Sequence, residues 1–207
     1  CKVEYLGLEN VHLIEQDAAA IDLSVDSVDL VVSNLGINNF ENAEAVLCTC
    51  HRVMKPGGRL LLTTNLVGHM KEFYDVYRDV LTQIGLQRYL SALDAHINHR
   101  ATLESTKALL GSAGLIPGEI STDTLTMRFA TGSALLRHCF IRRGFLPAWT
   151  AVVVPDVVEE TFTALERKLN TAGRERGELV LTIPMACVEA QKEPRISGHA
   201  ARPDENV

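Results

Sequence analysis

The chain has 207 residues, 46% of them hydrophobic, and a formal net charge of -6. This length allows one substantial hydrophobic core, and no apolar run approaches the ~20 residues that a membrane-spanning helix needs. Lys and Arg form no block, which argues against nucleic acid as the main partner, because neutralising phosphates requires clustered cations. The composition therefore favours a soluble single domain that handles a small molecule, with no membrane partner.

The cysteine content points to a reducing compartment. Five cysteines are present and none forms a Cys-x-x-Cys pair, so a disulfide framework is not indicated. No basic segment followed by an apolar stretch opens the chain, and no signal peptide is expected. These features predict a cytoplasmic location.

The first third of the chain predicts strands that alternate with a helix. The first ten residues indicate a helix end and a loop, and residues 11–15 alternate like a short strand, which puts Asp17 just beyond a strand end. Residues 27–33 contain an apolar run, which predicts a strand buried on both faces of a parallel sheet. A helical pattern over residues 43–53 ends near the turn at 55–58, and the next strand is expected at 59–64.

Two further helices are predicted before the pattern changes. Apolar positions trace one helix face over residues 70–84, with Gly85 at the expected stop, and a second helix is expected over 102–113, ended by Gly114. Strands that alternate with helices in this way are typical of a Rossmann-like, doubly wound α/β sheet.

The last third predicts a helical insertion between two strands. Strands are expected at 119–129 and 179–190, where they can pair antiparallel, and helices at 131–141 and 156–170 lie between them. We therefore expect one α/β domain over residues 1–192 with a helical cap at 130–172. Residues 193–207 are polar and aperiodic, so a disordered tail is predicted.

Three segments resemble motifs of the class I S-adenosylmethionine-dependent methyltransferases, in particular the small-molecule methyltransferases. They are residues 12–18 (HLIEQDA), 28–35 (VDLVVSNL) and 51–62 (HRVMKPGGRLLL). In that family these motifs are strand three with its acidic loop, strand four with the loop beside the transferred methyl, and the turn into strand five. The resemblance implies a sheet of order 3-2-1-4-5-7-6 and S-adenosylmethionine as cofactor.

The resemblance also assigns roles at two strand ends. Asp17 would accept a hydrogen bond from the adenine amino group while the backbone of Ala18 contacts the ring; a solvated loop residue or helix N-cap is the structural alternative for Asp17. Asn34 and Leu35 would lie beneath the sulfonium as cofactor contacts, and Gly36 would lie beside the substrate. A structural Asx-turn is the alternative there.

One part of the family pattern is missing. The sequence contains no Gly-x-Gly, and only ten residues precede the strand expected at 11–15, whereas a βαβ unit needs roughly 30. We therefore expect an N-terminally truncated fragment, or a chain whose other half comes from elsewhere.

Other candidate site residues lie near the expected rim. His69 is a candidate catalytic base, with a helix-start histidine as the alternative. The expected substrate-binding residues are Gly36, Asn39, Arg137, His138 and Trp149. Arg137 and His138 would meet an acidic group, or form a solvated face. Trp149 would form an apolar lid with Phe140 and Phe145, or pack inside the cap.

A metal site is not indicated by the sequence. His96 and His99 are three residues apart and would be a weak ligand pair, since no third ligand is near.

Two other functions compete with methyl transfer. A short-chain dehydrogenase lacks support because no Tyr-x-x-x-Lys pair occurs. A non-catalytic binding or scaffolding protein with the methyltransferase fold remains open, as does a homodimer. We predict S-adenosylmethionine-dependent methyl transfer to a small-molecule acceptor by in-line displacement, a reaction that relies mainly on positioning and therefore requires no dedicated base.

Overall fold

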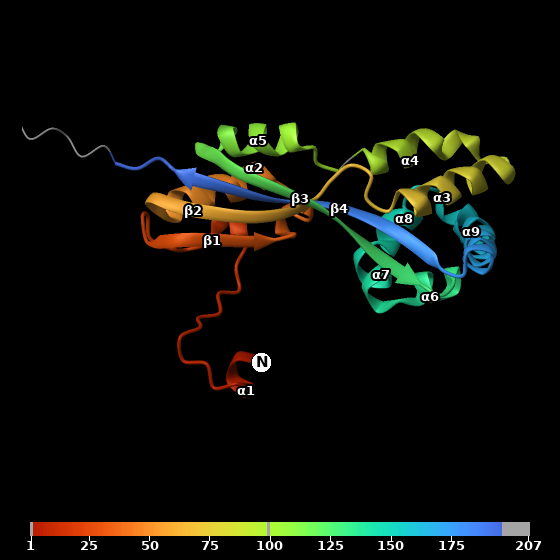
Figure 1. The fold of residues 1–207 in the computed structure, drawn as a ribbon, viewed down its shortest axis with the longest axis horizontal. Helices are drawn as coiled ribbons and strands as arrows, with labels where there is room; N and C mark the ends of the chain where they lie inside the picture. The colour runs from red at the N-terminus through yellow and green to blue at the C-terminus, as the bar shows by residue number, and fades with distance from the viewer. Residues whose placement is uncertain (1, 99, 196–207) are drawn as a thin grey trace, which may run out of the picture.

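The computed structural model describes residues 2–98 and 100–195 (Figure 1). Four strands form one mixed sheet in the order β1-β2-β4-β3: β1 (Val28–Asn34), β2 (Met54–Asn65), β4 (Leu179–Lys192) and β3 (Leu115–Phe129). β1 is parallel to β2, whereas β4 is antiparallel to both β2 and β3. The predicted α/β fold and the antiparallel pairing of the last two strands are confirmed, and this order is the one implied for strands four, five, seven and six.

The remaining elements are helical. The α-helices are α1 (Lys2–Tyr5), α2 (Ala43–Val53), α3 (Lys71–Gln83), α4 (Leu90–Ile97), α5 (Leu103–Ser112), α6 (Gly132–Arg137), α7 (Cys139–Gly144), α8 (Leu146–Thr150) and α9 (Pro155–Arg176). Short 3-10 helices are η1 (Ala18–Ala20), η2 (Gly36–Asn38) and η3 (Gln87–Tyr89). The predicted stops after α3 and α5 are confirmed, because Gly85 and Gly114 both adopt positive φ there.

Two hydrophobic cores lie at opposite ends of the long sheet (Figure 1). The first core joins α2 and α5 to the sheet. The side chains at its centre are Leu47, Leu60, Leu62, Leu110, Ala186 and Val188. The second core joins α3, α8 and α9 to the other end of β4, and its centre contains Phe73, Tyr77, Trp149, Leu165, Leu181 and Ile183.

The two cores use opposite faces of β4. Ala186 and Val188 contact the first core, whereas Leu181 and Ile183, at odd positions, contact the second. The strand therefore connects both cores, and the site described below lies where the cores meet.

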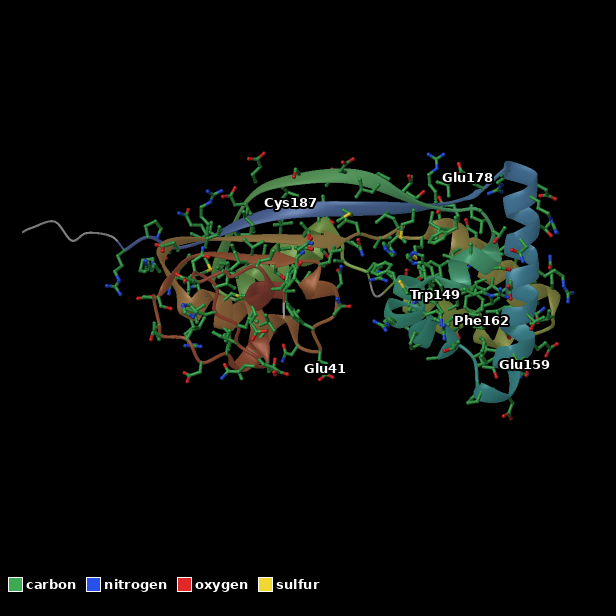
Figure 2. The ribbon with its side chains drawn as sticks, turned by 90° about the horizontal axis from the view of Figure 1, so that it is seen from below. Glu41, Trp149, Glu159, Phe162, Glu178 and Cys187 are labelled. Atoms are coloured by element: carbon green, nitrogen blue, oxygen red, sulfur yellow. The ribbon has the colours of Figure 1, made fainter. Side chains whose placement is uncertain are left out.

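Three expectations about the strands and helices are wrong in detail. Residues 11–15 form no strand: they are exposed, and no described strand lies beside them to exchange hydrogen bonds. β1 is not buried on both faces, because Leu30 and Val32 are 50% and 65% exposed. The face of β1 and β2 opposite α2 carries no helix in the described part of the chain (Figure 2), so the doubly wound arrangement is not seen there.

The helix expected at 131–141 is broken into α6 and α7 at His138, whose backbone is extended with ψ 132°. The break has a packing reason. Leu135 and Ile141 are both fully buried, yet residues six apart point about 120° apart on a continuous helix. Breaking the helix between them lets both side chains enter the same core.

Two expectations lie wholly or partly outside the described residues. The tail predicted at 193–207 is described only to residue 195, and His99 of the weak ligand pair is not described. α4, which carries His96, ends at Ile97.

Candidate functional site

Polar side chains connect the carboxyl ends of β1 and β2. The Thr63 hydroxyl donates to Asn34 Oδ1 at 2.7 Å and accepts from the Leu35 backbone N–H at 3.0 Å. Leu35 is held in the left-handed region with φ 57°, which turns the chain sharply out of the sheet. The strand end is therefore a locked, polar corner of the kind at which α/β sheets bind ligands.

Gly36 makes this corner sterically specific. A Cβ atom at this position would lie 2.7 Å from Ser33 Oγ and 3.0 Å from the Phe40 ring, so a larger residue would require the Ser33 and Phe40 side chains to shift. The Asn39 side chain then donates to the Leu35 carbonyl at 3.2 Å. The loop after β1 is thus held by side-chain hydrogen bonds from Thr63 and Asn39, which does not prevent its remaining groups from contacting a ligand.

Two adjoining hollows open beside this corner. The strand-end hollow, of about 430 Å³, is lined by Leu35, Asn38, Asn39, Asn65, His96, Arg100, Phe140, Gly144, Phe145 and Ala148. The α2–α5 hollow, of about 510 Å³, includes Ile37, Asn38, Phe40, Glu41, Thr64, Arg100 and Thr106 in its lining. Asn38 and Arg100 line both, and Asn38 Oδ1 accepts from the Thr64 hydroxyl at 2.7 Å.

His69 lies behind the strand-end hollow and lines neither hollow. Its ring is stacked on Phe145, with the ring centroids 5.7 Å apart, and the side chain is only 3% exposed. Burial, with a smaller contribution from the Arg100 charge, lowers the pKa of His69 to about 4. The imidazole is therefore neutral at pH 7 and a weak base, and its buried Nδ1 has no hydrogen-bond partner.

Trp149, predicted to bind substrate, lies in the core of the cap instead. It is fully buried, its ring stacks on Phe73 at 3.8 Å between centroids, and its Nε1–H donates to the Tyr74 hydroxyl at 3.1 Å. Tyr74 in turn contacts His96 Nε2 at 3.1 Å. The indole therefore supports Tyr74, which contacts His96 in the lining of the strand-end hollow. Phe140 and Phe145, the other residues of the expected lid, do line that hollow.

The remaining predicted site residues lie outside both hollows. Arg137 is exposed and lies 3.6 Å from Glu166 of α9, and the His138 ring packs edge-on against Phe129. Asp17 is exposed and caps η1 by accepting from the Ala19 N–H at 3.0 Å, the structural role that was its alternative.

The segment after Asp17 is fixed against α2. The Thr49 hydroxyl donates to the Ala19 carbonyl at 2.7 Å, and Arg52 donates to two further carbonyls, those of Ile21 and Leu23. Ala18, beside the cap, is half-buried. The predicted adenine-contacting loop therefore has a defined position even though no strand precedes it.

The lining residues that sequence reasoning missed include Asn38, Asn65 and Arg100. Asn65 ends β2, so the argument that selected Asn34 at the end of β1 would also have selected it. Arg100 carries no comparable signal, because it lies in a connection between two helices. Within residues 2–98 and 100–195, no group of three His, Cys, Asp or Glu side chains is placed to hold a metal, and no helix is long and apolar enough to cross a membrane.

A mixed sheet with polar groups at the carboxyl ends of its parallel strands is typical of α/β proteins that use a cofactor. Comparisons with known proteins indicate which of these proteins the chain resembles. A family model described as a methyltransferase domain matches residues 2–62. The ubiquinone/menaquinone biosynthesis C-methyltransferase UbiE of Blochmanniella pennsylvanica (strain BPEN) is 39% identical over 89 residues, 41% of this chain and 35% of that protein. The malonyl-acyl-carrier-protein O-methyltransferase of Methylococcus capsulatus is 28% identical over 134 residues, 64% of this chain and 44% of that protein.

The fold agrees with these matches. The YcgJ protein of Bacillus subtilis has a TM-score of 0.55 to this structure at 15% identity, over 93% of this chain and 75% of that one. Residues 2–62 thus resemble a methyltransferase domain in sequence, and the chain as a whole resembles a solved structure in fold. It spans between about a third and about half of the length of the two curated relatives described.

Proposed function

We propose that this protein transfers a methyl group from S-adenosylmethionine to a small-molecule acceptor held in the strand-end hollow. The observation that carries this proposal is the locked polar corner at Asn34, Leu35 and Thr63, of which Leu35 lines a hollow walled by the helical cap. In-line transfer needs the acceptor and the methyl group aligned, and a rigid strand end with a cap above it supplies that alignment.

The residues at two loops have chemistry that suits the cofactor. Asp17 uses Oδ1 to cap η1, and a carboxylate oxygen accepts more than one hydrogen bond, so an adenine amino group can still bind there. Ala18 would contact the adenine ring through its backbone. Asn34 accepts from Thr63 through Oδ1, which leaves its amide N–H₂ group to donate to the methionine portion, beside Leu35.

When bound, S-adenosylmethionine supplies a methyl on a sulfonium: an acceptor lone pair forms the new bond as the carbon–sulfur bond breaks and leaves S-adenosylhomocysteine. The chain's own residues orient the acceptor. Gly36 lets it approach the backbone closely, and Asn39 lines its hollow. The acceptor proton passes to water, or to the unpartnered Nδ1 of His69 if Phe145 moves aside.

The relatives suggest which acceptor atoms to test first. One is named as a C-methyltransferase of ubiquinone and menaquinone biosynthesis, and another as an O-methyltransferase of a malonyl carrier protein. Both carbon and oxygen acceptors are therefore reasonable for this chain.

The proposal is tested by calorimetric titration of the full chain with S-adenosylhomocysteine. We expect binding that weakens about tenfold in Asp17→Ala and in Asn34→Ala, since each removes a hydrogen bond to the ligand. Asp22→Ala is the matched control, because Asp22 is an exposed carboxylate of the same segment. A folded chain that binds no S-adenosylhomocysteine would overturn the proposal and favour the non-catalytic binding protein.

A further inference from the structure

Arg100 is a half-buried cation at the centre of the site, where it lines both hollows. Its neighbours carry no compensating charge. Burial raises the pKa of the Tyr74 hydroxyl, and the hydrogen bond from Trp149, the Arg100 charge and a hydrogen bond from Arg100 offset part of that rise, so Arg100 has a neutral hydrogen-bond partner in Tyr74. His69, which Arg100 also influences, is neutral for the reason given above. Tyr74 and His69, whose pKa values Arg100 influences, are therefore uncharged at pH 7.

None of the described residues that line the strand-end hollow is a carboxylate. Among the described residues Arg100 forms no ion pair, whereas Arg78, on the adjacent α3, pairs with Asp94 of α4. Glu41 lines the α2–α5 hollow but is exposed and does not pair with Arg100. A partly desolvated cation without a counterion is unfavourable, and an anionic ligand would remove that cost.

Asn65 adds a second unsatisfied group to the same hollow. The residue is only 7% exposed, and its Oδ1 atom is buried without a hydrogen-bond partner. A buried acceptor left unpaired costs free energy, so native structures generally provide a donor. Oδ1 itself has almost no accessible surface, so a ligand hydroxyl or amine in the hollow would be such a donor once the Asn65 amide turns Oδ1 towards the hollow.

The third feature is the apolar wall from the cap. Phe140 and Phe145 lie edge to face, with their ring centroids 5.4 Å apart, and Ala148 lines the hollow beside them. Phe140 is 51% exposed, so part of its ring is available to a ligand. The volume of about 430 Å³ suits a small molecule with an apolar body.

We propose that the acceptor bound in the strand-end hollow is a small anionic molecule, whose carboxylate or phosphate pairs with Arg100 and whose hydroxyl or amine donates to Asn65 Oδ1. Phe140 and Phe145 cover its apolar body. The planar guanidinium can engage either anion through two parallel hydrogen bonds. The inference rests on the proposed function only in treating this molecule as the methyl acceptor.

The test is calorimetric titration of the full chain with the three hydroxybenzoate isomers, which vary the separation between anion and hydroxyl. The matching hydroxybenzamides are neutral, so the difference in affinity measures how much the negative charge contributes to binding. Phenyl phosphate distinguishes a phosphate site from a carboxylate site. We expect at least one anion to bind about tenfold or more tightly than its neutral counterpart, as a charge-assisted hydrogen bond predicts.

Variants then assign the effect to residues. Arg100→Gln should abolish the preference for the anion, and Arg100→Lys, which keeps the charge, should retain part of it. Arg176→Gln is the control, because Arg176 is an exposed cation at the end of α9 that lines neither hollow. Asn65→Leu should reduce hydroxybenzoate affinity to that of benzoate. Circular dichroism checks that each variant is folded. If Arg100→Gln does not fold, Arg100→Lys is used instead to measure the dependence of anion binding on Arg100.

The outcomes separate this inference from the proposed function. Equal binding of anions and neutral analogues, or an anion preference that survives Arg100→Gln, would overturn the anionic acceptor. If S-adenosylhomocysteine still bound in that case, methyl transfer would stand. Anion binding that depends on Arg100 without any S-adenosylhomocysteine binding would keep the anion site and reject the methyltransferase proposal.

Discussion

The buried histidine gives the protein a pH-dependent stability that can be calculated. His69 is 3% exposed, and its pKa is lowered from 6.5 to about 4, mainly by burial. Below pH 6.5 the unfolded chain binds a proton at this site that the folded chain does not bind. The stabilising contribution of the neutral imidazole is therefore complete above pH 6.5 and is lost as the pH falls from 6.5 towards 4.

The size of the effect follows from the shift in pKa. Lowering the pKa of His69 from 6.5 to about 4 corresponds to about 3 kcal/mol in total, of which about 2 kcal/mol is lost between pH 7.5 and pH 5. Several carboxylates, including Asp26 and Glu72, also have lowered pKa values, but these groups titrate mainly below pH 5. The interval from pH 7.5 to pH 5 therefore reports chiefly on histidines.

The assay is urea unfolding of the wild type and of His69→Phe at pH 7.5, 6 and 5. Phenylalanine keeps a ring against Phe145 and cannot be protonated, so the difference in unfolding free energy between the two proteins should change by about 2 kcal/mol over this range. His12→Phe removes an exposed imidazole and should show no such change. A difference for His69→Phe that is independent of pH would refute the argument that the imidazole is buried and neutral.

Three further substitutions test the fold and the site. Trp149→Ala removes a fully buried indole stacked on Phe73, and urea unfolding should show a loss of about 3–5 kcal/mol; a loss below about 1 kcal/mol would contradict its position in the core. Thr102→Ala removes the capping box of α5 and should cost about 1 kcal/mol in the same assay, whereas no change would indicate that the cap is not formed. Thr63→Val keeps the strand but removes both hydrogen bonds to the β1 corner. Calorimetry should therefore show several-fold weaker S-adenosylhomocysteine binding. Unchanged binding would show that this corner does not contribute to cofactor binding.

The elements that the sequence predicted well are those with a strong local pattern. α3 carries its buried side chains, among them Phe73 and Tyr77, at helical spacing, and Gly85 ends it in the left-handed region. α5 begins directly after its capping residue Thr102, which is the first residue of the helix expected over 102–113. Such signals arise within a few residues along the chain, so the sequence by itself determines them.

The strands show where local patterns fail. The segment 11–15 alternates as a strand would, yet a strand exists only where another strand accepts and donates its hydrogen bonds. The segment 28–34 does form β1, but the burial of Leu30 and Val32 depends on which elements cover their face of the sheet. In the described part of the chain no helix covers that face (Figure 2). Strand burial is thus a property of the assembled sheet.

The residues of the candidate site also divide into those that the sequence alone determined and those that the tertiary structure decided. Asn34 and Gly36 were selected because they follow a strand, and the sequence alone determined that polar groups collect there. Whether Trp149 lines a pocket or fills a core, and whether Arg100 meets Asn65 in one hollow, was decided by the docking of the helical cap onto the sheet. Local periodicity follows from short-range backbone geometry, whereas the composition of a cavity depends on contacts between distant segments, which leave no local pattern in the sequence.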